Sequence, residues 1–187
     1  MIKFYAPKDP WGCFSNFSRH QVTIYNRTWQ TSEHPFQAMK FHSHRPDIVA
    51  MVHAAPSPGA AARLGRDRSY PLRSDWNSNP RHNMLGESFP ESISMEEADA
   101  MVQPDDGVNR QGVVAEPLFA RVKDVIMYEV CLAKFTQHGD LKETLLSTGD
   151  EVLIEDAEYD PYWGWGASFV GENKLGRILM AVRHQIR

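Results

Sequence analysis

A long amphipathic pattern in the second half of the chain constrains the fold most. Between about residues 119 and 137, apolar side chains recur at helical spacing and crowd one broad face, and Gly139 follows as a stop signal. The apolar positions are Phe119, Val122, Val125, Ile126, Tyr128, Val130, Leu132 and Phe135. So broad an apolar face is typical of a helix packed against a core, and a second such helix is expected at about 174–186.

Shorter elements are expected elsewhere in the chain. We predict helices at about 32–42, 46–54, 57–65 and 141–146, and three short strands at Ile2–Tyr5, Gln21–Tyr25 and Glu151–Ile154. Asn26-Arg27 is predicted to form a tight turn leading into Thr28-Trp29. Because these elements do not alternate as βαβ units would, the expected class is α+β with helices dominant. A length of 187 residues fits one compact domain over 1–187.

Residues 77–119 differ from the rest of the chain in composition, since Asn, Ser, Pro, Gly and acidic residues dominate there. Residues 82–119 hold eight acidic residues and one basic residue, a net charge of −7, whereas the remainder holds 19 basic and 16 acidic residues, a net charge of +3. The overall charge of −4 therefore comes from this segment, which we interpret as an acidic insertion. The composition excludes a polycation, but it allows a slightly basic body that binds an anionic substrate.

Cysteine use and hydropathy indicate a cytoplasmic protein. Cys13 and Cys131 are far apart, without a CxxC motif or a zinc-finger spacing, so a disulfide scaffold is excluded and a structural zinc is not expected. No apolar run approaches the ~20 residues that span a bilayer, and the N-terminal segment lacks the apolar core of a signal peptide. No membrane association is expected, and the oligomeric state is left open.

The first candidate for chemistry is an acid, an amide and an amine on one predicted helix. Glu33, Gln37 and Lys40 lie along a single stripe of the 32–42 helix, which Thr31 or Ser32 would cap. A desolvated carboxyl group there could act as a general acid or base, and a desolvated lysine could act as a nucleophile. The alternative is a solvated helix face with an ordinary charge pair.

The second candidate is an arginine-rich segment with a local charge of +3 over residues 61–81. Its charged members are Arg63, Arg66, Arg68, Arg73 and Arg81, with Asp67 and Asp75 interleaved. Guanidinium groups match phosphate oxygens, so the segment suits a phosphorylated ligand. Internal Arg–Asp pairing that ties down a loop is the alternative.

The third candidate is the loop D-P-Y-W-G-W-G at residues 160–166. Glycines allow its backbone to approach a ring-shaped ligand while an indole stacks on that ring, and Asp160 could orient a hydroxyl group or a water. A hydrophobic plug under a tight turn is the alternative. The histidines show no HExxH motif, and no metal site is expected.

Five motifs together resemble the YbiA-like, or NADAR, family. They are F-Y-x-P…W-G-x-F-S-N-F (4–17), W-x-T-S-E-H-x-F-Q-A-x-K-F (29–41), A-A-R-L-G-R-D-R-S-x-P-L-R-x-D-W (61–76), D-x-Y-W-G-x-G (160–166) and G-x-N-x-L-G (171–176). The similarity covers about residues 2–76 and 120–187. Several long motifs in the same order are far more specific than any one of them.

The resemblance implies a single YbiA-like domain and N-glycosidase chemistry on ribosyl compounds. Family members cleave the base–ribose bond of phosphorylated riboflavin-pathway intermediates or remove ADP-ribose from guanine bases in nucleic acid. The resemblance assigns catalysis to Glu33, Lys40 and Asp160, and no cofactor is expected. It assigns substrate binding to Asn16, Phe17, Gln37, Arg66, Arg68, Arg73, Trp76, Trp163, Gly164 and Asn173.

The acidic segment departs from the family pattern, because compact bacterial members run almost directly from the D-W end of the arginine motif into the long helix. Here residues 77–119 intervene, as a lid, an interface or an idle loop. The substrate is therefore either a small phosphorylated ribosyl compound or ADP-ribosylated guanine. The alternative to an enzyme is a non-catalytic ADP-ribose or nucleotide-binding module, which would need neither Glu33 nor Lys40.

Overall fold

The computed structural model describes residues 1–78 and 117–187. Most of the predicted acidic insertion, including Arg81, lies outside these residues. The helices are α1 (Glu33–Met39), α2 (Pro46–His53), α3 (Pro58–Arg66), α5 (Val122–Gln137), α6 (Gly139–Ser147) and α7 (Lys174–Gln185), with a short 3-10 helix at Gly12–Phe14. The strands are β1 (Ile2–Phe4), β2 (Val22–Ile24), β3 (Arg27–Trp29) and β4 (Leu153–Glu155). The predicted α+β class with helices dominant is confirmed.

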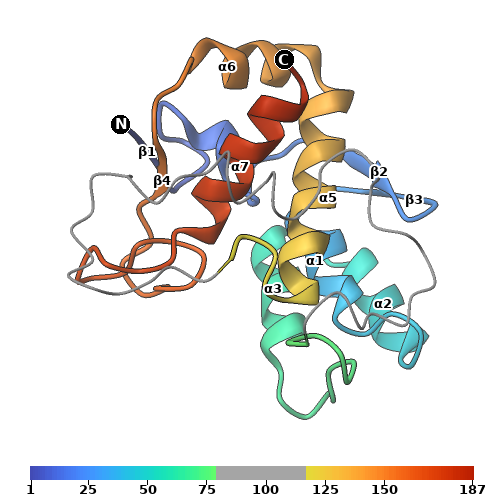
Figure 1. Ribbon diagram of the computed structural model, residues 1–187. Coiled ribbons are helices and arrows are strands. Elements are labelled where there is room, and N and C mark those ends of the chain that lie inside the picture. The colour runs from blue at the N-terminus through green and yellow to red at the C-terminus, as the bar shows by residue number, and fades with distance from the viewer. Residues whose placement is uncertain (79–116) are drawn as a thin grey trace.

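Helices α5 and α7 form the centre of the larger core and run side by side (Figure 1). Val130 and Phe135 on α5 and Ile178 and Val182 on α7 are wholly buried. The two amphipathic patterns of the sequence therefore cover each other, and each removes the apolar face of the other from water.

Helix α1 lies between two hydrophobic clusters and is buried along its whole length. Phe36 and Met39 belong to the core around α5 and α7, whereas Ala38 and Phe41 belong to a second cluster with α2 and α3. A helix of seven residues is too short to be stable alone, so these two contact surfaces hold it in place. The polar side chains of α1 are consequently fixed against a packed background.

The strands form two separate pairs. β1 and β4 are parallel, with Ile2 opposite Leu153 and Phe4 opposite Glu155, although nearly the whole chain separates them. β2 and β3 form an antiparallel hairpin. The β1–β4 pair positions the loop after β4, because the Asp156 N–H donates to the Phe4 carbonyl at 2.9 Å.

Three local predictions were wrong in detail. The hairpin turn is formed by Tyr25 and Asn26, whose φ values are 55° and 58°, so Arg27 is already in β3. Helix α1 ends at Met39 rather than near residue 42. Gly139 does not simply end the long helix but begins α6, since His138 alone separates the two helices.

The cap of α1 also differs from the prediction. Ser32 occupies the N-cap position without a capping hydrogen bond, and the Thr31 hydroxyl instead pairs with His34 Nδ1 at 2.8 Å. Within 1–78 and 117–187, none of the helices has the length and apolar character needed to cross a bilayer.

Candidate active site

Glu33 and Gln37 form a buried pair on α1. Gln37 Nε2 donates to Glu33 Oε1 at 2.7 Å, and the two residues are 4% and 6% exposed, respectively. The Glu33 N–H donates to the carbonyl of Asn16 at 3.2 Å, which ties the start of α1 to the N-terminal segment. Burial raises the pKa of Glu33, while the Gln37 hydrogen bond and the charges of Lys40 and Arg66 oppose that shift. Glu33 therefore does not lie on a solvated helix face, and its buried carboxyl group is suited to general acid–base catalysis.

Lys40 follows α1 directly and is also removed from bulk water. Its Nζ donates to the carbonyl of Gly65 at 3.1 Å and lies 5.6 Å from the centre of the Phe36 ring and 5.8 Å from that of Trp76. Burial lowers the pKa of Lys40 to about 8, against the opposing charge of Glu33. On the order of a tenth of the side chains then carry a neutral, nucleophilic amine at pH 7.

The loop after β4 contacts α1 through aromatic rings. Asp160 Oδ1 accepts hydrogen bonds from the backbone N–H groups of Tyr162 (3.1 Å) and Trp163 (2.9 Å), which fixes the start of the turn. The Trp163 ring then meets the Phe36 ring edge to face, with 5.3 Å between centres, and Trp76 packs on Phe36 at 5.4 Å. Through Phe36, α1 contacts both the loop that carries Trp163 and the end of the arginine segment at Trp76.

The arginine segment divides into two kinds of side chain. Arg73 is buried and forms a two-pronged ion pair with Asp75 (2.5 and 2.7 Å), and its backbone N–H donates to the Lys40 carbonyl at 2.8 Å. Arg66 and Arg68, at the end of α3, are exposed and form no hydrogen bond or ion pair with another described residue. The alternative of an internal Arg–Asp pair therefore applies to Arg73, whereas the exposed side chains of Arg66 and Arg68 are available to bind an anion.

Two predicted binding residues form the frame beneath the loop. Asn173, wholly buried with φ 47°, accepts a hydrogen bond from the Glu155 N–H (3.0 Å) and donates to the Leu153 carbonyl (2.8 Å) through its side-chain amide. A Cβ on Gly164 would lie 2.6 Å from the Glu155 carbonyl oxygen, so the chain packs there against β4. Both residues position the loop, and their contact with substrate stays a prediction.

Asn16 and Phe17 belong to the N-terminal segment, and Asn16 contacts α5. Asn16 Nδ2 is 3.1 Å from Met127 Sδ, and its Oδ1 is 4.0 Å from Cys131 Sγ. Phe17 is half-buried and its N–H donates to Ser15 Oγ at 3.3 Å. The structure records these contacts within the protein, and substrate binding by the two residues stays a prediction.

Sequence reasoning missed Glu155, the last residue of β4. The predicted strand ended at Ile154, one residue too early. The side chain is half-buried, but its Oε2 is sealed from solvent and has no hydrogen-bond partner among the described residues. Burial, together with the smaller effects of the negative charges of Asp160 and Glu33, raises the pKa of Glu155 to about 8. An acidic residue at the end of an apolar strand that leads into a candidate loop was the available signal.

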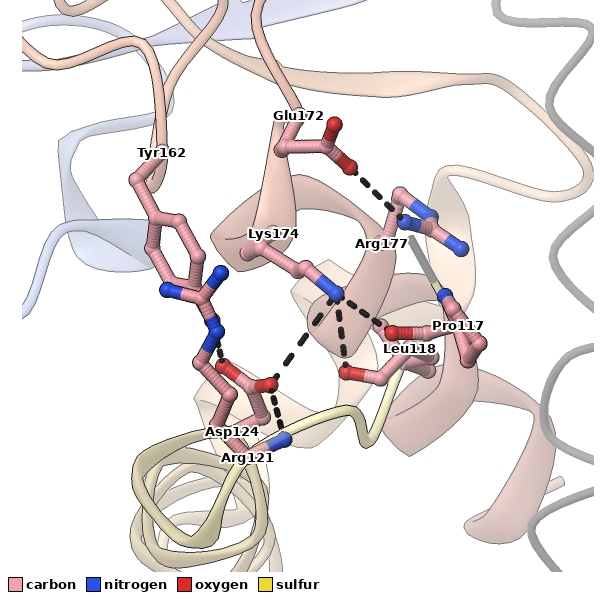
Figure 2. Close-up of polar contacts among 8 residues, drawn as sticks. All are labelled: Pro117, Leu118, Arg121, Asp124, Tyr162, Glu172, Lys174 and Arg177. Atoms are coloured by element: carbon pink, nitrogen blue, oxygen red, sulfur yellow. Dashed lines mark hydrogen bonds and ion pairs between the residues drawn. The ribbon is translucent and has the colours of Figure 1, made fainter. Parts of the chain in front are cut away.

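A second group that the sequence did not reveal anchors the same loop to α5 and α7 (Figure 2). Asp124 and Lys174 are both wholly buried, with 4.0 Å between Oδ2 and Nζ. The Tyr162 hydroxyl donates to Asp124 Oδ1 at 2.5 Å, the Arg121 N–H donates to Oδ2 at 2.9 Å, and Lys174 Nζ donates to the Pro117 carbonyl at 2.5 Å. Both buried charges have several polar partners, so the network is stable in the interior. Through its hydrogen bond to Asp124, Tyr162 attaches the loop to α5.

In the part of the chain that the structure describes, no group of three or more His, Cys, Asp or Glu side chains is arranged to hold a metal ion. The negative charge of Asp160 helps to raise the pKa of both Glu33 and Glu155, but these three carboxyl groups do not form such a ligand set. The site as described offers acid, amine and guanidinium groups.

Comparison with known proteins places this arrangement in a family. N-glycosidase Npun_R5314 of Nostoc punctiforme is 37% identical over 100% of this chain and 92% of its own. N-glycosidase YbiA of Escherichia coli is 35% identical over 100% of this chain and 88% of its own. The NMR structure of E. coli YbiA superposes with a TM-score of 0.68 at 34% identity, covering 98% of this chain and 83% of that one. The chloroplastic riboflavin biosynthesis protein PYRR of Zea mays is 32% identical over 100% of this chain and 25% of its own.

The family model of the NADAR domain matches residues 3–90 and 88–187. The two matches meet at residues 88–90, within the acidic segment. The motifs, the fold and the full-length similarity agree, and the chain belongs to the NADAR domain family.

Proposed function

We propose that this protein is an N-glycosidase, a hydrolase that cleaves the bond between a base and ribose in a phosphoribosyl or ADP-ribosyl compound. The observation that carries the proposal is the buried Glu33, which accepts a 2.7 Å hydrogen bond from Gln37, on the helix that Lys40 directly follows. Burial raises the pKa of Glu33 and lowers that of Lys40 to about 8. The names of the relatives from Nostoc punctiforme and E. coli support this reaction class.

The reaction needs two kinds of charge stabilisation. Breaking the C1′–N bond builds positive charge at the anomeric carbon and negative charge on the departing base. Glu33 in its acid form protonates the base, and its carboxylate then stabilises the cation. Lys40 either assists electrostatically or attacks C1′ with its neutral amine, so that the ring opens to an imine that water later hydrolyses. These steps draw on side chains alone, without a metal or a cofactor.

The groups around Glu33 suit a phosphorylated ribosyl substrate. Arg66 and Arg68 offer exposed guanidinium groups for a phosphate, and the half-buried Trp163 offers aromatic surface beside Phe36, whereas Trp76 is buried against Phe36. The name of the maize relative supports a riboflavin-pathway intermediate as the smaller candidate. ADP-ribosylated guanine in nucleic acid is the larger one, and it would draw more heavily on the exposed arginines.

A reducing compartment suits this protein. Cys13 and Cys131 are both free thiols, and Cys131 is buried. We therefore propose that the protein acts in the cytoplasm.

Parallel turnover assays test the function. The parent protein is incubated with a phosphorylated ribosylamino-pyrimidine and with an ADP-ribosyl-guanosine oligonucleotide, and the released base is measured. Release from one of them that is lost in Glu33→Gln supports the proposal and identifies the substrate. Binding of ADP-ribose without release of base from either compound would contradict it and would indicate a binding module instead.

A further inference from the structure

The side chain of Tyr162 is held by a hydrogen bond and by contacts of its ring. Its hydroxyl group donates to Asp124 Oδ1 at 2.5 Å (Figure 2), the Lys123 amine lies 3.6 Å from the centre of its ring, and the Trp163 ring meets it at 86° with 5.0 Å between centres. Asp124 is wholly buried, and its Oδ2 accepts from the Arg121 N–H at 2.9 Å. The partner that orients Tyr162 is thus itself fixed on α5.

The backbone of the same part of the loop is fixed independently by the start of α7. The Tyr162 carbonyl accepts from the Lys174 N–H at 3.1 Å, and the Trp163 carbonyl accepts from the Leu175 N–H at 3.0 Å. The hydroxyl group of Tyr162 is therefore not needed to fix the path of the chain. Its hydrogen bond to Asp124 fixes the orientation of the side chain, and with it the ring against which Trp163 packs.

Trp163 connects this orientation to the candidate active site. Its half-buried ring meets the Phe36 ring at 88° with 5.3 Å between centres, and Lys40 Nζ lies 5.6 Å from the centre of that Phe36 ring. Phe36 is also close to one turn along α1 from Glu33. A single ring separates Trp163 from Lys40, so a base that extends from C1′ can reach the accessible part of the indole.

We propose that the hydrogen bond from Tyr162 to Asp124 positions the Trp163 indole for stacking on the base of the substrate. This role rests on the proposed N-glycosidase function. Tyr162 acts through Trp163 and is a positioning residue, because it does not itself touch the reacting atoms. A base that stacks on an indole already held in place loses less binding free energy to ordering than one that stacks on a mobile indole, so the hydrogen bond contributes to affinity.

The expected defect lies in KM. Because the base stacks on Trp163 both before and during cleavage of the C1′–N bond, a loosely held indole weakens the two states alike. Tyr162→Phe removes only the hydroxyl group and should raise KM by about five- to tenfold, with kcat changed by less than about threefold. Tyr159→Phe is the matched control, since it removes the hydroxyl group of a tyrosine in the same loop that is 89% exposed. Both constants should stay at the parent values there.

A second control separates positioning from stability. Thr148 directly follows α6, away from α1 and α3 (Figure 1), and its buried hydroxyl group accepts from the buried Arg183 at 2.7 Å. Thr148→Val also removes a buried hydroxyl group, so it should lower the melting temperature and keep the parent KM. The proposal is overturned if Thr148→Val raises KM as much as Tyr162→Phe does, or if Tyr162→Phe keeps the parent KM.

A further measurement does not depend on turnover. When fluorotryptophan replaces the five tryptophans, each indole gives a ¹⁹F signal, and Trp163→Phe identifies the signal of Trp163. Tyr162→Phe should broaden or divide that signal, because the indole then samples several orientations, whereas Tyr159→Phe and Thr148→Val should leave it unchanged. An unchanged Trp163 signal in Tyr162→Phe would count against the proposal. If the signal responds as expected but the parent releases no base, the proposed function fails while the anchoring of Trp163 by Tyr162 stands.

Discussion

Gly65 on α3 lies directly against the side chain of Gln37 on α1: a Cβ placed on Gly65 would be 1.7 Å from Gln37 Oε1 and 3.2 Å from Gln37 Cβ. Gln37 is itself the hydrogen-bond partner of Glu33. The glycine of the arginine motif therefore allows the amide of one helix to reach the carboxyl group that we assign to catalysis. The Gly65 carbonyl also accepts from Lys40, so one residue borders both candidate catalytic groups.

Gly65→Ala is expected to displace Gln37 and to lower kcat by about tenfold or more, because Glu33 loses a hydrogen bond to its charged form. The alkaline limb of the pH–rate profile, where Glu33 loses the proton that it must donate, moves to higher pH for the same reason. Gly59→Ala in the same helix is the matched control, since its nearest contact would be 3.8 Å away. That control should keep parent activity and gain up to about 1 kcal/mol in the free energy of unfolding. Equal effects of both changes on kcat would contradict the assignment.

Glu33→Gln tests the acid directly. The amide keeps the volume and can still pair with Gln37, but it cannot donate a proton to the departing base. We expect kcat to fall by about 10²- to 10⁴-fold while the melting temperature changes little. Single-turnover measurement of base release checks this, and release at the parent rate would rule out Glu33 as the acid.

Experiments on Lys40 distinguish nucleophilic attack by its amine at C1′ from a purely electrostatic role. If the neutral amine attacks C1′, base release rises with pH towards the Lys40 pKa of about 8, because the neutral fraction grows over that range. Borohydride added during turnover should then leave a stable adduct on Lys40, detectable by mass spectrometry of the digested protein. Lys40→Arg keeps the positive charge but cannot form an imine. Substantial activity in Lys40→Arg without an adduct in the parent would favour the electrostatic route.

The two kinds of arginine predict two kinds of defect. Arg66→Ala removes an exposed guanidinium group, so KM for a phosphorylated substrate should rise about tenfold or more while stability is kept. Arg73→Ala leaves the half-buried Asp75 without its ion-pair partner and should lower the melting temperature. Thermal unfolding and Michaelis kinetics on both variants distinguish these outcomes. A pure stability loss in Arg66→Ala would remove that residue from the anion site.

Lys134 makes the stability depend on pH in the alkaline range. The side chain is wholly buried on α5, and Nζ donates to the carbonyls of Cys13 (2.5 Å) and Ser15 (3.0 Å) and to the Ser18 hydroxyl (2.7 Å). Burial lowers its pKa to about 8, below the 10.5 of a free lysine. Between these values the unfolded chain binds more protons than the folded one, so stability increases as the pH rises.

Urea denaturation at pH 8 and pH 10 measures this dependence. The free energy of unfolding should increase over that interval by an amount on the order of 2 kcal/mol from Lys134. In Lys134→Met the increase should be smaller by that amount, although the variant is less stable throughout because three acceptors lose their donor. An unchanged slope in the variant would show that Lys134 does not titrate in this range.

The helices and the Glu33, Gln37 and Lys40 stripe could be predicted from the sequence, because each depends on residue spacing within a single helix. The offsets of Glu33, Gln37 and Lys40 survive even though α1 is shorter than predicted, since Lys40 follows its last turn directly. The hairpin turn was misplaced by one residue, because positive φ at Tyr25 has no strong composition signal.

Contacts between distant segments gave no comparable signal. Asp124 and Lys174 read as ordinary surface charges on their helices, and their mutual burial follows from the crossing of α5 and α7. Glu155 depends on Asn173, on the loop and on α1 at once, so no window of sequence contains its environment. The sequence also did not show which arginine is paired internally. Asp75 pairs with Arg73 and not with another described arginine of the segment.

The parallel pairing of β1 with β4 has a consequence for how the chain reaches its native state during synthesis. Ile2–Phe4 leaves the ribosome long before its partner Leu153–Glu155, because a long stretch of chain separates the two strands. The N-terminal strand must therefore wait with unpaired backbone groups, and the segment that carries Glu155 stays open until that pairing occurs. Such long-range closure is a slow step in folding, so we expect nascent chains to complete this part of the candidate site late.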